Sequence, residues 1–504
     1  MRTLYRASLV RTQSFPWTAE WLLVDERHVQ RAGSGEPPGA DRVVDLPGTT
    51  ITPGFVDAHV HLTGTGIHHR APEVAATSSA GDLLAALRRI AVDRPGGPIL
   101  VHGWDETRWT TPGFPSIDDL DRVVDRPLLA MRADGHVSLA NRRAIAEAGA
   151  EDVEGVHRDA DGRPTGRVDR RANTTLRAWM ERHLDAREVE ELQLAAASLA
   201  VSRGVTCVHE MSLPEDRGTR DLEILLGHRA RLPVDVVPYV GTTDVASVID
   251  AGVSTIGGDV SVDGSVGART AWLREPYADG SGSGVSYYDD DELAQFFHDG
   301  HLAGLQVAVH AIGDAAVDQV LRTWERVYVT LDSRGRRHFR ARRHRIEHFE
   351  LVDGRLIERA AALGLAVSVQ PAFDAEWGWP GGLYELALGE ARAASMNPFA
   401  SIAGRGIELG AGSDSPVTPL DPLAGIAALE RHHDAAQRMS RPEAVRAFTI
   451  GAARLAHHDD KKGSLAPGAH ADFVAWDGDP FEADDPTGIA AALTVSLGRE
   501  VFAS

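Results

Sequence analysis

The sequence predicts an α/β protein whose body is a closed barrel of parallel βα units, beside a small β-sandwich formed by both chain ends. Three observations support this fold class. The chain has 504 residues, which is long enough for a barrel of about 250 residues with insertions. Its middle alternates helix-length segments with short apolar runs. Its two ends hold short strand-like runs separated by glycine and proline.

The middle of the chain repeats a helix-then-strand order. Thus "AREVEELQLAAASLAVSRG" precedes "VTCVHEM", and "DELAQFFHDGHLAG" precedes "LQVAVHAIGD". This order is typical of parallel βα units, and about half a dozen of them in roughly 400 residues indicate a closed barrel with insertions. We expect the barrel over residues 51–459, with an insertion at about 65–175.

The two chain ends resemble each other in pattern. "TLYRASLV", "WLLVDE" and "DRVVDL" lie near the start, and "ADFVAWDGDP" and "AALTVSLGREVFA" lie near the end. Isolated hairpins are marginally stable in water. Residues 1–50 and 460–504 are therefore predicted to form one composite β-sandwich.

Composition narrows the class of protein and the kind of partner. Hydrophobic residues make up 43% and charged residues 25%, as in soluble globular proteins. The formal net charge of −21 disfavours nucleic acid and anionic membranes as partners, because both require a basic face. No signal peptide and no run of about 18 apolar residues is recognisable, so the cytoplasm is the expected location and a small molecule the expected partner.

The single cysteine, Cys207, excludes an intrachain disulfide and a thiolate zinc cluster. Any metal ion must then be held by carboxylates and by some of the 22 histidines. The stretch "ITPGFVDAHVHL" places His59 and His61 two residues apart, on the same face of a strand. Two interpretations are open for this pair alone, namely half of a metal site or two exposed strand histidines.

Further ionisable residues recur where apolar runs end. Catalytic groups of (β/α) barrels lie at the carboxyl ends of the strands, and these ends offer His59, His61, Glu210, Asp259, Asp263, His310, His348 and Asp414. Proteins rarely bury ionisable groups without a partner or a metal. The pattern predicts a divalent metal centre, suited to zinc, with an open position for water.

The order of motifs along the chain is similar to that of a known family. The motifs include "TPGFVDAHVHL", "HGWDETRW", "GVTCVHEMS", "DGSVGARTAWL", "VHAIGDAAVDQVL", "RIEHFELVD", "GSDSPV" and "GSLAPGAHADFVAWDGDP". They resemble metal-dependent hydrolases of the amidohydrolase superfamily, in the YtcJ-like branch (amidohydrolase family 3). The resemblance implies a distorted (β/α)₈ barrel, a β-sandwich from both termini and, because such barrels are often dimers, a homodimer.

The resemblance also assigns roles to individual residues. His59 and His61 match the metal-binding pair of strand one, and His310 and His348 match the histidines after strands five and six. Asp414 matches the aspartate after strand eight, which binds metal and handles the proton of the attacking water.

One position departs from the family. Relatives usually carry a bridging lysine four residues before the aspartate that corresponds to Asp263, and here Asp259 stands there.

That departure leaves two designs of the centre open. A one-ion design uses His59, His61, His310 and Asp414, with His348 steering the substrate or water. A two-ion design needs Asp259 or Glu210 as the bridge, with Asp259 otherwise a loop residue. The shorter reach of aspartate favours one ion slightly.

Four residues are candidates for contact with substrate. Trp104 and His136 belong to the insertion, which is expected to form a lid over the barrel mouth, and Asp263 and Gln370 follow strand-like runs. Packing inside the insertion is the other interpretation of its aromatic residues. Gly412 is predicted to permit a close backbone approach. The histidines of "RHHD", which begins at Arg431, are assigned no role.

Three functions are compatible with these residues. The first is hydrolysis of an amide-type C–N bond by a metal-activated water. The second is deamination of an amino-heterocycle or amidine, because deaminases of the superfamily use one metal and commonly lack the lysine. The third is a catalytically inactive barrel that only binds ligand. The motif "HAIGD", which begins at His310, is ordinary in the YtcJ-like branch and favours amide hydrolysis.

Overall fold

The computed structural model describes residues 1–504 except 72–73, 107–108, 111–112, 133–136 and 213–219. The chain divides into two compact units. Unit 1 comprises Met1–Thr65, Ala196–Pro214 and Leu225–Ser504, and unit 2 comprises Gly66–Ala195 and Glu215–Ile224. The two segments of unit 2 lie between segments of unit 1 in the sequence, and the predicted insertion at about 65–175 falls almost wholly within unit 2.

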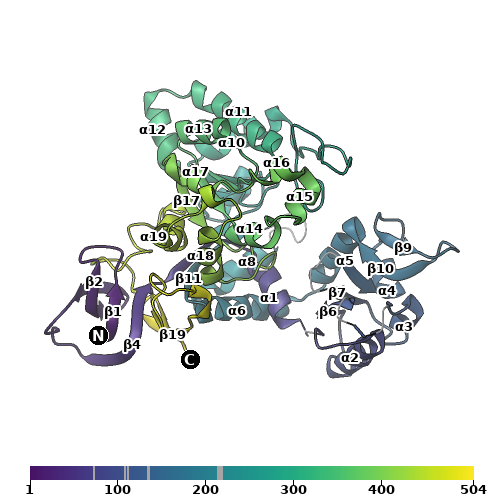
Figure 1. Cartoon of the computed structure of the whole chain (residues 1–504), viewed down its shortest axis with the longest axis horizontal. Coiled ribbons are helices and arrows are strands. Elements are labelled where there is room, and N and C mark those ends of the chain that lie inside the picture. Colours follow the sequence, from purple (N-terminus) through teal and green to yellow (C-terminus); the bar gives the residue numbers. More distant parts are fainter. Residues whose placement is uncertain (72–73, 107–108, 111–112, 133–136, 213–219) are drawn as a thin grey trace. The chain divides into compact units, whose positions relative to one another are not determined.

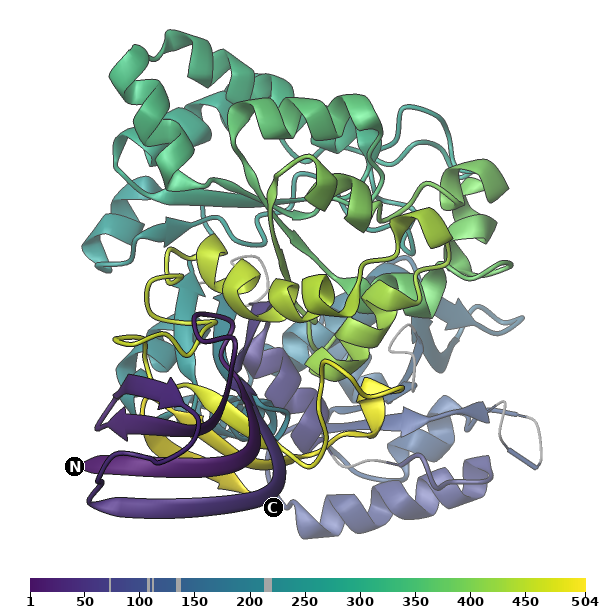
Figure 2. The ribbon, with the colours of Figure 1, turned by 60° about the vertical axis from the view of Figure 1, so that its left-hand side comes forward.

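Strands from both chain ends form one seven-stranded sheet in unit 1, in the order β20-β19-β18-β4-β1-β2-β3. Figures 1 and 2 show the purple amino-terminal strands beside the yellow carboxyl-terminal ones. The central strand β4 runs parallel to β1 and antiparallel to β18. The strands are β1 (Arg2–Arg11), β2 (Thr18–Asp25), β3 (His28–Gly33), β4 (Arg42–Pro53), β18 (Phe473–Trp476), β19 (Ala491–Ser496) and β20 (Arg499–Ala503).

This terminal sheet has a core to which both chain ends contribute. Tyr5, Leu22 and Ile51 from the first strands pack in one buried cluster with Phe473 and Val495 from the last. Neither end alone would bury this apolar surface, which is why the two ends fold together. The sandwich form of the terminal unit stays a prediction.

The other strands described in unit 1 are eight short parallel strands. They form a three-stranded sheet, β12-β11-β5, and a five-stranded sheet, β13-β14-β15-β16-β17. Isolated parallel bridges link Val240 to Ile256 and Val60 to Ser415, at the edges of these two sheets. The strands are β5 (Phe55–Val60), β11 (Val205–Met211), β12 (Asp235–Tyr239), β13 (Thr255–Ile256), β14 (Gln306–Ala311), β15 (Arg345–His348), β16 (Ala366–Val369) and β17 (Glu408–Ala411).

Helices alternate with these strands, and their ends carry recognisable capping residues. Asp289 caps α10 in a capping box with Glu292, and Asp353 caps α13, which ends at Gly364 in the left-handed conformation. The helices described in this region are α9 (Val245–Asp250), α10 (Asp290–Leu302), α11 (Asp314–Thr330), α12 (Ser333–Arg342), α13 (Gly354–Leu363), α14 (Pro371–Trp377), α15 (Leu383–Leu388), α16 (Glu390–Ala393), α17 (Phe399–Gly404), α18 (Pro422–Glu430), α19 (Arg441–Arg446) and α20 (Ala452–Leu455).

Substitution of Gly204 by alanine is expected to destabilise unit 1 by about 2–5 kcal/mol. Gly204 has φ +74°, and a Cβ there would lie 2.6 Å from Cζ2 of the buried Trp476. The change therefore adds overpacking to left-handed strain. Gly252→Ala is the matched control, because Gly252 has φ +68° and no atom would lie within 4 Å of its Cβ. Denaturant unfolding should show a clearly smaller loss for the control, and equal losses would contradict the packing argument.

Unit 2 is a separate α/β body with a five-stranded sheet in the order β6-β7-β8-β10-β9. Its core includes Leu83, Val101 and Leu128 together with Trp104 and Trp109. Its strands are β6 (Ile99–Trp104), β7 (Leu128–Arg132), β8 (Val137–Ala140), β9 (Val156–Arg158) and β10 (Pro164–Asp169). Its helices are α2 (Ala80–Asp93), α3 (Ile117–Asp121), α4 (Arg142–Glu147), α5 (Arg170–Arg182) and most of α8 (Arg220–His228), while α1 (Leu62–Arg70) and α6 (Ala186–Ser202) belong partly to each unit.

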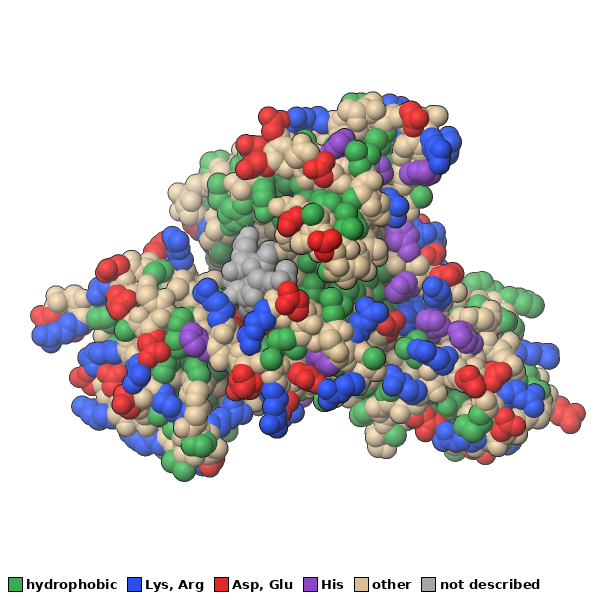
Figure 3. Space-filling model, turned by 180° about the vertical axis from the view of Figure 1, so that it is seen from behind, with side chains coloured by type: hydrophobic (Ala, Val, Ile, Leu, Met, Phe, Trp, Pro, Cys, Tyr) green, Lys and Arg blue, Asp and Glu red, His purple; other side chains and the backbone are tan. Residues whose placement is uncertain are grey.

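The surface seen in Figure 3 intersperses acidic and basic side chains, without one sign dominating that face. The described part of the chain contains no helix with the length and apolar character of a membrane span. Cys207 is buried and unpaired as a thiol.

Candidate metal centre

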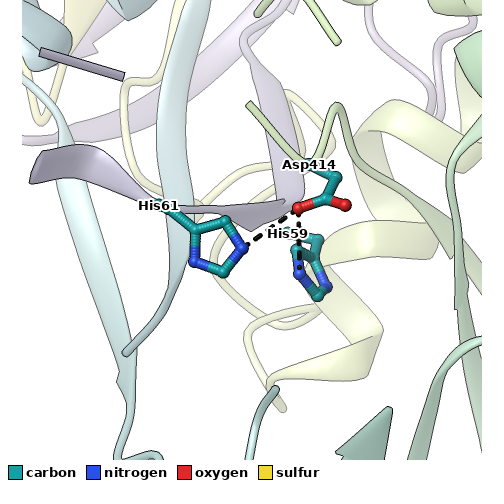
Figure 4. Close-up of side chains that lie close together, drawn as sticks. All are labelled: His59, His61 and Asp414. Atoms are coloured by element: carbon teal, nitrogen blue, oxygen red, sulfur yellow. Dashed lines mark ion pairs between the residues drawn. The ribbon is translucent and has the colours of Figure 1, made fainter. Parts of the chain in front are cut away.

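The two histidines of the opening motif converge with Asp414 (Figure 4). His59 lies on β5, His61 directly follows the end of β5, and Asp414 follows β17. Oδ1 of Asp414 lies 3.4 Å from Nε2 of His59 and 3.1 Å from Nε2 of His61. The side chain of His59 is fully buried and that of Asp414 is 8% exposed. The i, i+2 spacing thus directs both imidazoles at one carboxylate, as the sequence predicts for a metal-binding pair.

Asp259 lies among the same side chains. Its Oδ1 is 3.2 Å from Nδ1 of His310, 3.4 Å from Nε2 of His348 and 3.8 Å from Nε2 of His59. Its Oδ2 is 3.6 Å from Nε2 of His61. One carboxylate therefore faces all four histidines that the resemblance assigns to the metal.

In three of these imidazoles, the nitrogen that faces away from the centre has a hydrogen-bond partner of its own. Nδ1 of His59 lies 3.0 Å from Oε2 of Glu347, and Nδ1 of His61 lies 2.7 Å from the Met211 carbonyl. Nδ1 of His348 lies 2.8 Å from Oε1 of Gln370. Because these oxygens only accept hydrogen bonds, each Nδ1 donates a proton to its oxygen, which leaves each Nε2 able to offer a lone pair to a bound cation. Metal-binding histidines in proteins show this arrangement.

His310 has the opposite orientation. Its Nε2 lies 3.5 Å from the Gly264 carbonyl oxygen, while its Nδ1 faces Asp259. Buried atoms at the centre also have no hydrogen-bond partner among the described residues, namely Nε2 of His59 and Oδ1 of Asp414. The donor set of four imidazoles and two carboxylates, with lone pairs directed inward, fits a divalent cation of the zinc class.

The electrostatics of the centre favour positive charge. Burial opposes protonation of His61, but the adjacent Asp414 carboxylate, 3.1 Å from Nε2, outweighs burial and raises the pKa of His61 to about 9. Asp259 likewise outweighs burial at His348 and raises the pKa of that imidazole to about 10. Burial raises the pKa of Asp259, yet the hydrogen bonds from His310 and His348 hold it well below the usual value. Without a metal, protons on His61 and His348 balance the charge of the two carboxylates. A bound cation would supply that positive charge instead.

Two of the converging residues have unusual backbone conformations. His348 has φ +71° and Asp414 has φ +55°, in the left-handed region that non-glycine residues seldom adopt. His348 ends β15, and Asp414 lies three residues after the end of β17. Such strained residues concentrate at functional sites, where the surrounding structure holds them.

A buried ionic network supports His59 from the other side. Arg345 and Glu347 are fully buried on β15, and Nη2 of Arg345 donates to Oε2 of Glu347 at 2.8 Å. Arg345 also donates to the hydroxyl of Tyr239 at 2.8 Å and to the Ala58 carbonyl at 3.0 Å. Neither Arg345 nor Glu347 is among the candidates predicted from the sequence. The signal was the alternation Arg-x-Glu inside the short, buried run "RIEH".

The close approach predicted at Gly412 is confirmed. A Cβ at Gly412 would lie 2.5 Å from the backbone nitrogen of His59 and 2.8 Å from Oδ1 of Asp57. Asp57, which the sequence analysis also missed, accepts the N–H groups of Ser413 at 2.9 Å and of His59 at 3.2 Å. Burial is the main cause that raises the pKa of Asp57 to about 7. Asp57 therefore joins the loop that carries Asp414 to the strand that carries His59.

The residues predicted to contact substrate have other contacts. Trp104 is buried in unit 2 and donates its indole N–H to the Ala130 carbonyl at 2.8 Å. Asp263 is buried and accepts three backbone N–H groups, those of Trp272, Ile312 and Gly313. Gln370 lies against His348. His136 lies outside the described residues. Substrate contact by any of the four stays a prediction.

Substitution of Gln370 by leucine is expected to weaken metal binding at the centre by about 10–100-fold. The change removes the oxygen that accepts the Nδ1–H of His348 and thereby fixes the imidazole. Competition with a chromogenic chelator measures the affinity, and Gln295→Leu on the exposed side of α10 is the control. A raised KM with unchanged metal affinity would instead assign Gln370 to substrate binding.

Comparison with known proteins agrees with this geometry. The sequence model described as "Amidohydrolase family" matches residues 42–502. YtcJ of Bacillus subtilis (strain 168), classed as an amidohydrolase, is 30% identical over 502 aligned residues, which cover 91% of this chain and 89% of YtcJ. An N-substituted formamide deformylase of Arthrobacter pascens is 25% identical, covering 87% of this chain and 85% of the deformylase.

A solved structure shows the same similarity in three dimensions. The crystal structure of an uncharacterised metal-dependent hydrolase from Pyrococcus furiosus aligns with a TM-score of 0.79 and 28% identity. The alignment covers 96% of this chain and all of that one. Sequence and fold agree, and the chain belongs to the amidohydrolase family, in its YtcJ-like branch.

Proposed function

We propose that this protein hydrolyses an amide-type C–N bond of a small molecule, using a water activated by a divalent metal. The observation that carries the proposal is the convergence of four imidazole rings on two buried carboxylates, Asp259 and Asp414. The similarity to a deformylase of N-substituted formamides supports N-formyl and N-acyl compounds as the first substrates to test.

The proposal includes the architecture that holds the centre. We infer that the eight parallel strands close into a distorted (β/α)₈ barrel, with the terminal sheet as a β-sandwich beside it. The bridges Val240–Ile256 and Val60–Ser415 support closure. They link both edges of the three-stranded sheet to the two edges of the five-stranded sheet, as the strand pairing of a closed barrel requires.

We further propose that the centre holds two ions, in place of the one-ion design that the sequence slightly favoured. The support is the position of Asp259, which presents Oδ1 to His310, His348 and His59 and Oδ2 to His61. Its short side chain suffices because the adjoining backbone pairs with the strand that carries His310, whose N–H donates to the Val260 carbonyl at 3.1 Å. Zinc is the proposed metal, given the nitrogen and oxygen donors.

Within the reaction, Asp414 is the proton-transfer group. A divalent cation bound here supplies Lewis acidity, which polarises a carbonyl and lowers the pKa of water to roughly 7. Asp414 accepts a proton from the attacking water and passes it to the leaving nitrogen. A C–O bond forms and the C–N bond breaks, giving a carboxylic acid and an amine. His59, His61, His310 and His348 would hold the cation.

A substrate panel with and without metal tests the proposal. Protein treated with a chelator and then reloaded with zinc should lose and regain turnover of N-formyl or N-acyl compounds. Release of ammonia from amino-heterocycles, with no turnover of amides, would establish the deaminase alternative. Metal well below stoichiometric amounts and no turnover of any substrate would support a binding-only barrel. The cytoplasmic location and the homodimer stay predictions from the sequence.

A further inference from the structure

A second group of metal-ligating side chains lies in unit 1, on elements that the proposed reaction does not use. Asp374 belongs to α14, and His432 and His433 directly follow α18 and Arg431. Asp374 and His432 are buried, and the His433 side chain is 14% exposed. These histidines are those of the "RHHD" motif, to which the sequence alone assigns no role. We call these three residues the Asp374 cluster.

The ligand atoms of the Asp374 cluster are spaced as around one cation. Oδ1 of Asp374 lies 3.3 Å from Nε2 of His432 and contacts Nδ1 of His433. All three ligand atoms lie within 4.8 Å of one another. Two ligands at zinc-bond length on a tetrahedral ion are separated by about 3.3–3.4 Å. The distance between Asp374 and His432 therefore suits a shared ion without rearrangement. A small shift of His433 would lengthen its contact with Asp374 to the same separation.

Surrounding groups orient the cluster as the outer contacts of a metal site do. The backbone N–H of His433 donates to Oδ2 of Asp374 at 3.1 Å, which leaves Oδ1 to face both rings. Nδ1 of His432 lies 3.1 Å from the Asp434 carbonyl, to which a metal-binding tautomer would donate. A Cβ at Gly378 would lie 2.5 Å from Oδ1 of Asp374 and 2.9 Å from Nδ1 of His433, so glycine keeps that side of the cluster unfilled.

We propose that Asp374, His432 and His433 bind an additional divalent cation of the zinc class, separate from the centre formed by the strand-end histidines. Three protein ligands leave one position for water. The cation would join α14 to the segment after α18. Since α14 also carries Phe373, which stacks on His348 with ring centroids 6.1 Å apart and planes at 10°, the cation would stabilise the aromatic side of the catalytic centre without taking part in the reaction.

The competing explanation is a hydrogen-bonded cluster without an ion. In that state Nδ1 of His432 accepts the Asp434 backbone N–H at 3.0 Å, and both histidines donate to Asp374. The two explanations differ in metal content and in electron density, which the experiment measures.

The test uses full-length protein stripped with a chelator, reloaded with zinc and freed of excess metal. The double variant Asp374→Asn/His433→Gln is expected to contain about one zinc equivalent less than wild type by plasma mass spectrometry. His338→Gln, on an exposed position of α12, is the control and should retain the full zinc content. If the double variant fails to fold by circular dichroism, the near-isosteric Asp374→Asn alone replaces it, with the same expected loss.

An anomalous difference map at the zinc edge gives a second readout on wild-type crystals. A peak bonded to Oδ1 of Asp374, Nε2 of His432 and Nδ1 of His433 would establish the site. Equal zinc content in the variant and wild type, or no peak at the cluster while the catalytic centre is occupied, overturns the proposal in favour of the hydrogen-bonded cluster. Neither result bears on amide hydrolysis, which is measured separately.

Discussion

Replacement of Asp414 by asparagine is expected to lower kcat by about two to four orders of magnitude, the usual contribution of a general acid–base group. Asparagine keeps the size of the side chain and one oxygen near His59 and His61, but it cannot accept and return the proton of the attacking water. Steady-state kinetics on the first active N-formyl or N-acyl substrate measures the loss. Metal content is expected to remain close to that of wild type.

Asp421→Asn is the matched control for this prediction. Asp421 lies in the same connection after β17, where it caps α18 through the Ala424 N–H, and asparagine caps helices equally well. The control should therefore retain near-wild-type kcat. A fully metallated Asp414→Asn enzyme with near-native kcat would exclude Asp414 as the proton-transfer group. Loss of metal in proportion to the loss of activity would make it chiefly a ligand.

Replacement of Asp259 by alanine is expected to reduce the catalytic centre from two bound ions to one at most. The change removes the carboxylate that faces His59, His61, His310 and His348, and with it the negative charge shared between the two ions. Counting the metal in the Asp374→Asn/His433→Gln background restricts the measurement to this centre. Turnover should fall because the second ion is lost.

Asp279→Asn provides the comparison for the Asp259 variant. Asp279 lies in the connection between β13 and α10, where it is an exposed partner of Arg269, and its replacement should leave the metal count unchanged. A single ion in the parent protein, with no change on removal of Asp259, would restore the one-ion design that the sequence favours.

The sequence allowed part of the centre to be predicted because local geometry decides that part. His59 and His61 must share a face in any strand. His310 and Asp414 follow apolar runs, and His348 ends one, and parallel strands in one sheet bring their carboxyl ends together. The pairing of both chain ends in the terminal sheet was also predictable, since neither end alone has enough apolar residues to make a core.

Other parts depend on distances that no local pattern contains. The position of Asp259 is one of these parts, because it depends on the pairing of its backbone segment with the strand that carries His310. Arg345 and Glu347 were overlooked because charged residues in a strand ordinarily face solvent, and only the structure shows both enclosed and paired.

By itself, the amino-acid sequence determined the alternation of strand and helix, the joining of the two chain ends, and the residue types able to hold a metal. Those properties follow from side-chain periodicity and composition, which act over a few residues. Only the tertiary structure decided which imidazole nitrogen faces the centre, that Asp259 lies among four histidines, and that Asp374 meets His432 and His433. Contacts of this kind join elements far apart along the chain, and the packing of the whole fold sets their distances.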